Sequence, residues 1–178
     1  MRTIVGVALT AVCFAVFLTG FARTREEAKE AKIERAMSAG PPGIAKNAKI
    51  VEIGASGMTT LREGDNGWTC SPGDPGVVGD DACLDGPAMQ WLADLMAHKP
   101  KPTNTTPGLL YMLNGGTSPS ATDPWARGGT PIKEPPHWAI MWPFDPKKTG
   151  LPDKPKPTGT WIMYAGTPYA HLMINQKP

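Results

Sequence analysis

Three histidines are the side chains of this sequence best suited to acid–base or metal chemistry: His98, His137 and His171. Three imidazoles and one water molecule form the ligand set of several catalytic zinc sites, where the metal lowers the pKa of the bound water. No two of these histidines are spaced as His-x-His or as i, i+4. A three-histidine zinc site would therefore depend entirely on the fold.

Sulfur ligands offer a second metal hypothesis, because soft thioethers select Cu(I). His171 and Met173 would share one face of a strand. Met112, Met141 and Met163, however, sit centrally in apolar segments, where methionine ordinarily fills the core. Zinc and copper are both conceivable, and neither is favoured.

A metal-free site is a third hypothesis, in which His137 or His171 acts as a general base with Asp123, Tyr164 or Tyr169 nearby. In either form the protein would be a hydrolase-like enzyme, metal-dependent or histidine-based, centred on the two histidines. Ser118 and Ser120 lack a surrounding Gly-x-Ser-x-Gly sequence, so neither is predicted to be the nucleophile.

Aromatic side chains near the ends of apolar segments point instead to ligand binding. Four of them are predicted to line a cleft at the strand ends: Tyr111, Trp138, Tyr164 and Tyr169. Such rings combine an apolar body with a polar tip, and they also pack in cores with the polar tip at the surface. A binding module for a small molecule or an envelope component is preferred to the enzyme.

The chain begins with the parts of an export signal. Arg2 precedes an apolar segment, residues 4–18, and Gly20 and Ala22 supply the small residues before a cleavage site after Ala22. Residues 1–22 are therefore predicted to be a signal peptide, and the mature protein to be periplasmic or secreted. The apolar run is also long enough for an uncleaved anchor, which would be the one membrane attachment.

The charge of the chain gives no reason to expect nucleic-acid binding. The formal net charge is +2, and it falls to +1 when Arg2 leaves with the leader. Binding to a phosphate backbone requires a clear excess of basic side chains. With 20 Gly and 20 Pro among 178 residues, the sequence predicts a loop-rich fold and not a helical bundle.

Cys70 and Cys83 are the cysteines that remain after removal of the leader. An even pair in an oxidising compartment usually forms a disulfide. The segment between them is rich in Gly and Asp, and closing it would stabilise the fold by about 3 kcal/mol on the chain-entropy model. We therefore predict a structural Cys70–Cys83 disulfide.

Four aspartates in and beside this segment could in principle hold calcium: Asp74, Asp80, Asp81 and Asp85. Their spacing does not follow the pattern of a calcium-binding loop. A solvated turn is the preferred interpretation.

Residues 23–47 are predicted to form a charged helical linker, because helix formers outnumber apolar residues and prolines follow. A single disulfide-stapled domain, residues 48–178, is expected to follow the linker. Asn66 and Gly67 suit a type I′ turn between strand-like segments. A small antiparallel three-stranded meander is therefore expected over residues 48–70.

Residues 85–99 carry the clearest helix signal, with Asp85 or Gly86 as the cap, Pro87 in the first turn and Pro100 beyond the end. The apolar spacing predicts a core face made by four residues: Met89, Leu92, Leu95 and Met96. His98 is expected in the last turn, where Asp94 and the helix dipole would favour its charged form.

Three apolar segments of similar character, residues 109–113, 137–142 and 160–166, are predicted to be buried strands. The expected class is α+β, with a loop-rich mixed or antiparallel sheet, one main amphipathic helix packed on it and an N-terminal helical leader.

Four segments of the chain resemble, in the same order, those of a group of uncharacterised exported bacterial proteins: LREGDNGWTC, LYMLNGGT, PPHWAIMWP and GTPYAHLM. The resemblance covers most of the chain from about Ala48 onward. It implies export, and it carries no activity, substrate, cofactor or functional residue. Ala170 stands where some relatives have an acidic residue, which argues against a chemical role for this position.

The leader makes a direct prediction about the mature chain. Mass spectrometry of the protein recovered from the expressing cell is expected to show Arg23 as the first residue, in the soluble exported fraction. A chain that keeps residues 1–22 and stays with membranes after a high-salt wash would instead indicate an uncleaved anchor.

Overall fold

The computed structural model describes residues 25–54, 57–73 and 80–176. The chain divides into two compact units, Met1–Lys32 and Ile33–Pro178. The predicted leader lies outside the described residues. Of the first unit, residues 25–32 are described and are helical. In the ranges given above, no helix has the length and apolar character that a membrane crossing requires.

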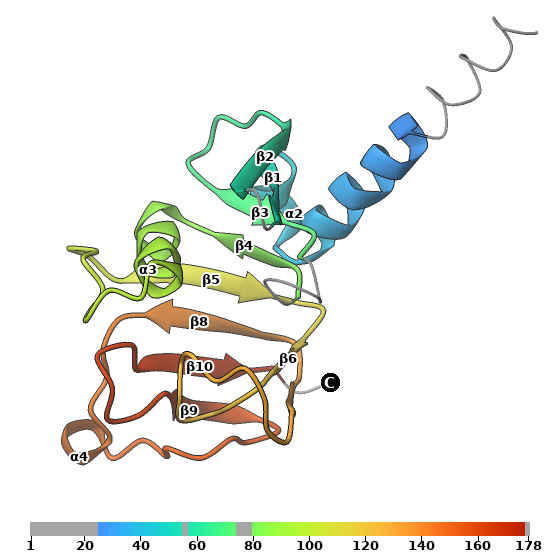
Figure 1. Ribbon diagram of the computed structural model, residues 1–178. Helices are drawn as coiled ribbons and strands as arrows, with labels where there is room; N and C mark the ends of the chain where they lie inside the picture. The colour runs from blue at the N-terminus through green and yellow to red at the C-terminus, as the bar shows by residue number, and fades with distance from the viewer. Residues whose placement is uncertain (1–24, 55–56, 74–79, 177–178) are drawn as a thin grey trace, which may run out of the picture. The chain divides into compact units, whose positions relative to one another are not determined.

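The second unit is an α+β domain built on an eight-stranded sheet (Figure 1). The strand order is β2-β1-β3-β4-β5-β8-β10-β9, and β6 and β7 form a separate two-stranded sheet. All neighbouring strands are antiparallel except β1 and β3, which are parallel. The predicted class, a mixed sheet with one main helix, is confirmed.

The strands have these bounds: β1 Lys49–Gly54, β2 Gly57–Arg62, β3 Thr69–Ser71, β4 Ala82–Leu84, β5 Gly108–Met112, β6 Gly116–Ser118, β7 Ile132–Glu134, β8 His137–Met141, β9 Gly159–Met163 and β10 His171–Asn175. The helices are α2 Pro42–Ala45, α3 Gly86–Met96 and α4 Pro146–Thr149, and residues 33–38 are also helical.

α3 is the main helix and packs on one face of the sheet, which we call the α3 face. Asp85 caps it as expected, because the Asp85 carboxylate accepts a hydrogen bond of 2.9 Å from the Ala88 N–H. The buried residues of α3 are Ala88, Trp91 and Asp94, while Met96 is 51% exposed. The predicted core face was therefore wrong at Met96. The helix is rotated so that Ala88 and Trp91 face the strands.

This rotation depends on a close approach between α3 and β5. A Cβ atom at Gly108 would lie 2.3 Å from the Ala88 nitrogen and 2.6 Å from its Cα. Glycine at the first position of β5 therefore lets the helix backbone rest directly on the strand.

The predicted antiparallel meander over residues 48–70 is wrong, because β3 pairs with β1 and runs parallel to it. The segment after β2 crosses the chain that enters β1. Arg62 donates hydrogen bonds of 2.9 Å to the carbonyls of Ala45 and Ala48, and the Asn66 amide donates one of 2.8 Å to Ile44. These bonds carry the chain to the far side of β1, so the Asn66-Gly67 turn does not close a hairpin.

The predicted disulfide is present between directly opposed residues of β3 and β4, Cys70 and Cys83. Both cysteines are fully buried, and part of the predicted linker packs against them. Ile33, Ala36 and Ala39 belong to this same core. The core therefore includes residues before position 48, because small side chains allow this helical segment to approach the disulfide.

The last two strands form a β-hairpin. β9 and β10 pair from His171 opposite Met163 to Asn175 opposite Gly159. β10 lies between β9 and β8, so the segment that contains His171 is an interior strand of the sheet.

We predict that Gly108→Ala destabilises the domain by about 2 kcal/mol or more, because the new methyl group would collide with the α3 backbone. Gly43→Ala in α2 is the matched control, since a Cβ atom there meets nothing within 4 Å. Its effect should be neutral or slightly stabilising. Urea unfolding of both variants measures the difference, and equal midpoints would contradict the close approach.

Candidate functional site

The register of the sheet decides which of the candidate residues can act together. The α3 face carries the side chains of His137, Ala139 and Met141 from β8 and of His171 and Met173 from β10, with Met173 opposite Ala139.

Asn175, and not His171, stands opposite His137. His171 is four residues further along β10, which is roughly 13 Å at about 3.3 Å per residue. The two histidines therefore stand at opposite ends of β10, and none of the described contacts joins their rings, although the charge of His137 contributes to the lowered pKa of His171.

The two histidines nevertheless share one local arrangement. His137 Nδ1 lies 2.8 Å from the carbonyl oxygen of Pro135, and His171 Nδ1 lies 3.0 Å from that of Tyr169. Each carbonyl belongs to the residue two positions earlier and can only accept a hydrogen bond. Nδ1 must therefore carry the proton in both rings, so a neutral ring presents Nε2 as a base or acceptor.

The His137 end of the face is a buried polar cluster. Glu134 of β7 places its Oε2 3.8 Å from His137 Nε2, and the Ser118 hydroxyl of β6 also hydrogen-bonds the Glu134 carboxyl group. His137 is 1% exposed, Glu134 8% and Asn175 6%. Four buried side-chain atoms of the described residues have no hydrogen-bond partner: the donors Trp91 Nε1 and Trp161 Nε1 and the acceptors Glu134 Oε1 and Asn175 Oδ1. The two unpaired acceptors belong to the residues beside His137.

The charge state of Glu134 reflects this environment. Burial raises the pKa of Glu134, and the charge of Asp80 raises it further, while Ser118 and His137 lower it. A carboxyl group with an elevated pKa next to an imidazole can hold or transfer a proton. Sequence reasoning missed Glu134, because no motif surrounds it and only the pairing of β6 with β7 aims it at His137.

The His171 end is predominantly aromatic. His171 is 5% exposed, and it makes edge-to-face contacts with Trp91 at 5.2 Å and Tyr164 at 5.3 Å between ring centroids. Burial lowers the pKa of His171 from 6.5 to about 4, against the opposing effect of the bond to Tyr169. His171 is therefore neutral at physiological pH.

The loop that contains Asp123 is bonded to the His171 end of the face, but none of the described contacts joins Asp123 itself to His171. The Tyr164 N–H donates a 2.8 Å bond to the Ala121 carbonyl, which joins the loop to the end of β9. Burial, followed by the charges of Glu134 and Asp123, raises the pKa of Tyr164. The Asp123 carboxylate itself accepts from the Trp125 N–H at 2.9 Å. Its observed contact is that of a turn residue and not of a base.

Tyr169 and His98 have structural surroundings. Tyr169 is fully buried, and its hydroxyl donates a 2.9 Å bond to the Lys99 carbonyl. His98 lies beyond α3 with a φ of 51° and stacks on Trp125 at 5.7 Å. The expected contact of His98 with Asp94 is replaced, because Asp94 pairs with Lys99 at 2.6 Å.

The four predicted ligand-binding aromatic residues therefore do not line one cleft. Tyr164 and Tyr169 lie at the His171 end, whereas Tyr111 and Trp138 are directly opposed on the other face of the sheet. Tyr111 and Trp138 are stacked at 6.4 Å, and Trp68 adds a third ring 5.5 Å from Tyr111. We call Trp68, Tyr111 and Trp138 the aromatic strip. All three side chains are partly exposed.

The three histidines considered as zinc ligands are dispersed in the fold. Across the described ranges, no three His, Cys, Asp or Glu side chains are placed to hold a metal ion, so His98, His137 and His171 make no zinc site. His171 and Met173 share a face as expected, but Met173 packs in the apolar core with Met141 and Met163. These three thioethers act as core filling.

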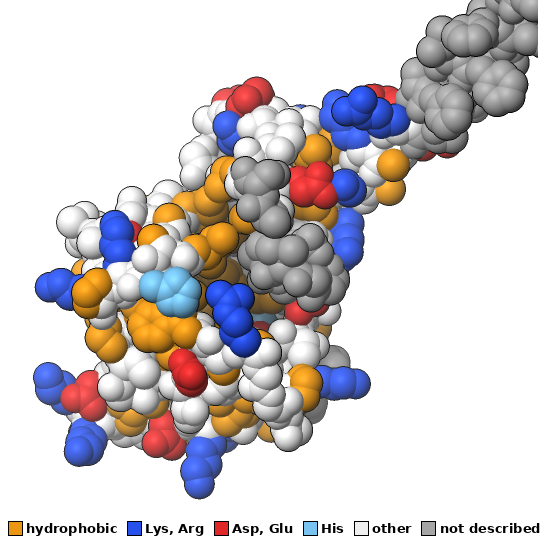
Figure 2. Space-filling model, viewed as in Figure 1, with side chains coloured by type: hydrophobic (Ala, Val, Ile, Leu, Met, Phe, Trp, Pro, Cys, Tyr) orange, Lys and Arg blue, Asp and Glu red, His pale blue; other side chains and the backbone are white. Residues whose placement is uncertain are grey.

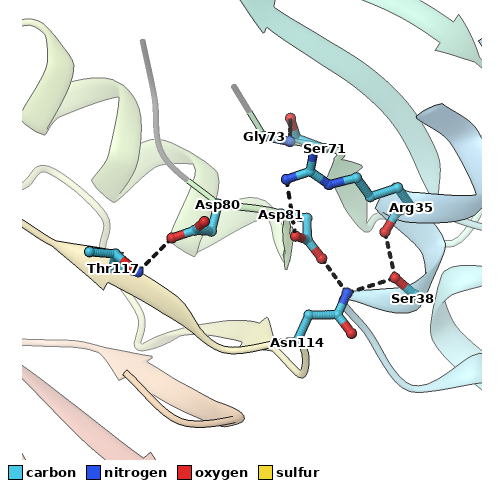
Figure 3. A network of polar contacts seen from close by, with 8 residues as sticks. All are labelled: Arg35, Ser38, Ser71, Gly73, Asp80, Asp81, Asn114 and Thr117. Atoms are coloured by element: carbon cyan, nitrogen blue, oxygen red, sulfur yellow. Dashed lines mark hydrogen bonds and ion pairs between the residues drawn. The ribbon is translucent and has the colours of Figure 1, made fainter. Parts of the chain in front are cut away.

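The aspartates proposed for calcium are directed to separate partners (Figure 3). Asp80 accepts from the Thr117 N–H, while Asp81 pairs with Arg35 at 3.6 Å and accepts from Asn114. Asp85 caps α3. Asp74 lies outside the described residues.

Two hollows mark the surface. One, of about 370 Å³, is lined by Asp80, Thr117, Pro119, Arg127, Gly128, Gly129 and Pro131. The other, of about 630 Å³, lies between the α4 segment and the turn before β10. Charged side chains of both signs are scattered over the face in Figure 2, without a large patch of one sign.

Comparison with known proteins identifies no relative. No family model, curated protein or solved structure matches this chain.

We predict that His171 makes the stability of the domain depend on pH. Because its pKa is lower in the folded state, its contribution is complete above pH 6.5 and is lost as the pH falls toward 4. The full loss is roughly 3 kcal/mol, since one pKa unit corresponds to about 1.4 kcal/mol.

Urea unfolding at pH 7, 6 and 5 measures this loss. His171→Phe should flatten the dependence in this range, whereas His98→Asn, at an exposed histidine with positive φ, should leave it unchanged. The same slope in all three proteins would contradict the assignment to His171.

Proposed function

We propose that this protein is an exported, periplasmic or envelope-associated binding module whose ligand lies on the aromatic strip. The observation that carries this proposal is the continuous contact of Trp68, Tyr111 and Trp138 on a sheet face that α3 does not cover. Partly exposed aromatic rings are a frequent source of binding energy, because they bury a large area with little loss of conformational freedom.

The strip lies between two covered regions of this face. On one side, the helical residues 33–38 and α2 pack over the disulfide, and on the other, Phe144 and Leu151 pack over Ile162 and Leu172. Trp138 belongs to neither core cluster. Trp68 and Tyr111 pack against the disulfide core with one part of each ring, and the partly exposed remainder of the strip is available to a ligand.

A neutral glycan is the ligand that best fits this surface. Trp138 has Ile174 beside it on β10, and Tyr111 occupies the other side on β5. Such a surface can bury the apolar C–H face of a sugar ring. The near-neutral net charge favours an uncharged ligand over a polyanion.

Export is supported by the predicted leader and by the resemblance of four segments to exported bacterial proteins. The buried Cys70–Cys83 disulfide is compatible with an oxidising compartment. An envelope location would place glycans within reach of the strip.

The hydrolase-like alternative draws little support from this arrangement. His137 and His171 stand at opposite ends of the α3 face, and Ser118 contacts Glu134 and not an imidazole in the contacts described. Catalysis by a nucleophile requires a base within hydrogen-bond reach.

A sedimentation assay with insoluble cell-wall glycan and with an uncharged polysaccharide tests the proposal. Trp138→Ala is expected to weaken binding about tenfold or more, the usual cost of removing a central aromatic anchor. Trp142→Ala, which removes a partly exposed tryptophan just beyond β8, is the matched control and should bind like the wild type. Equal binding by all three proteins, or none by the wild type, would reject the aromatic strip as the site.

A further inference from the structure

The unexplained feature of the α3 face is the excess of acceptors around His137. Glu134 and Asn175 are each more than nine-tenths buried, and each has one side-chain oxygen without a partner among the described residues. Buried acceptors are normally hydrogen-bonded, and an unpaired one costs free energy. Two such oxygens that flank one histidine indicate that a donor completes this cluster.

The ring of His137 cannot be that donor in its neutral form. Its Nδ1–H is committed to the Pro135 carbonyl, so Nε2 faces Glu134 as another acceptor. The neighbouring Asn175 amide is also committed, because its Nδ2 donates to the Lys156 carbonyl. The bonds made by His137 Nδ1 and Asn175 Nδ2 therefore fix the orientation of the two acceptors on the same side chains, His137 Nε2 and Asn175 Oδ1.

The cluster also carries excess negative charge. Asp80 is close enough to Glu134 for its charge to raise the pKa of that carboxyl group. The Asp80 carboxylate accepts from the Thr117 N–H, and in the described ranges no Lys or Arg nitrogen lies within ion-pair distance of Asp80 or Glu134. Two neighbouring carboxylates with no lysine or arginine partner in the described ranges, and with His137 as the one basic group beside Glu134, favour a cation.

The required cation must donate hydrogen bonds and need not be coordinated as a metal. The described His, Cys, Asp and Glu side chains do not form a three-ligand metal group. An ammonium group differs from a metal ion, because it makes separate N–H bonds to acceptors at about 2.9 Å and needs no shared coordination sphere.

From these observations we infer that the cluster of Glu134, His137 and Asn175 is a binding site for the ammonium group of a small primary amine. Glu134 Oε1 and Asn175 Oδ1 accept N–H bonds, His137 Nε2 offers a third acceptor, and the Glu134 carboxylate balances the charge. This site lies on the opposite face from the aromatic strip and is independent of it.

A surface hollow lined by Asp80 and Thr117 neighbours the cluster through these two residues, while Glu134, His137 and Asn175 are buried and do not line it. Its volume of about 370 Å³ suits a molecule of a few heavy atoms. Thr117 and Glu134 belong to paired strands, β6 and β7, and Asp80 is the electrostatic neighbour of both groups. Arg127 also lines the hollow, so the hollow carries charges of both signs.

Thermal unfolding of the purified protein in matched chloride salts tests the site. At pH 7.5 and constant ionic strength, ammonium and methylammonium are expected to raise the midpoint above that in sodium, and tetramethylammonium, which has no N–H donor, is not. The rise should diminish at lower pH, where Glu134 takes up a proton. Equal midpoints in all four salts would overturn the proposal.

Two variants assign the effect to the carboxyl group. Glu134→Gln keeps the shape but removes the charge, and it should weaken the apparent ammonium affinity about tenfold or more. Asp123→Asn removes an exposed carboxylate from the loop between β6 and β7 and should leave that affinity unchanged. An undiminished ammonium effect in Glu134→Gln would overturn the assignment.

A direct observation does not depend on variants. With ¹⁵N-labelled ammonium, a bound ion in this buried cluster should give a proton signal protected from solvent exchange, displaced by methylammonium. The absence of such a signal at saturating ammonium would show that water or a proton on Glu134 satisfies the acceptors, and the amine site would be rejected.

Discussion

The antiparallel register of β10 between β8 and β9 is the constraint on which the arrangement of functional groups depends. Because Asn175 stands opposite His137, and Met163 opposite His171, the polar and aromatic groups of the α3 face are sorted to its two ends. A shift by one residue would turn every side chain of β10 to the other face. The register thus separates the polar cluster around His137 from the aromatic cluster around His171.

Both ends bury polar groups, and they do so by different means. His171 stays neutral between the aromatic rings of Trp91 and Tyr164, and its Nδ1 donates a hydrogen bond to the backbone carbonyl of Tyr169. His137 lies beside Glu134, a carboxyl group whose pKa is raised by burial and by the charge of Asp80. Burial of ionisable groups is costly unless a partner or a proton compensates the charge. The separate β6–β7 sheet provides this compensation at the His137 end, since it carries Glu134 and Ser118.

The other face of the sheet is organised by covalent and steric constraints. The disulfide joins β3 to β4, and the segment before β1 packs on it closely enough that a Cβ atom at Gly40 would lie 2.7 Å from Cys83 Sγ. This packing covers one part of the face, and the segment around Phe144 and Leu151 covers another. Trp68, Tyr111 and Trp138 occupy the region between them.

The sequence by itself determined the class of the fold, the disulfide and the position of α3. These features depend on local information: apolar periodicity, the Asp85 cap and an even pair of cysteines. Tertiary structure decided how β3 pairs, because the hydrogen bonds of Arg62 and Asn66 are made to residues distant in the chain. It also decided that His137 lies beside Glu134 and opposite Asn175, and that His171 lies at the other end of β10. Strand order and register place these side chains, and no spacing along the chain encodes either one.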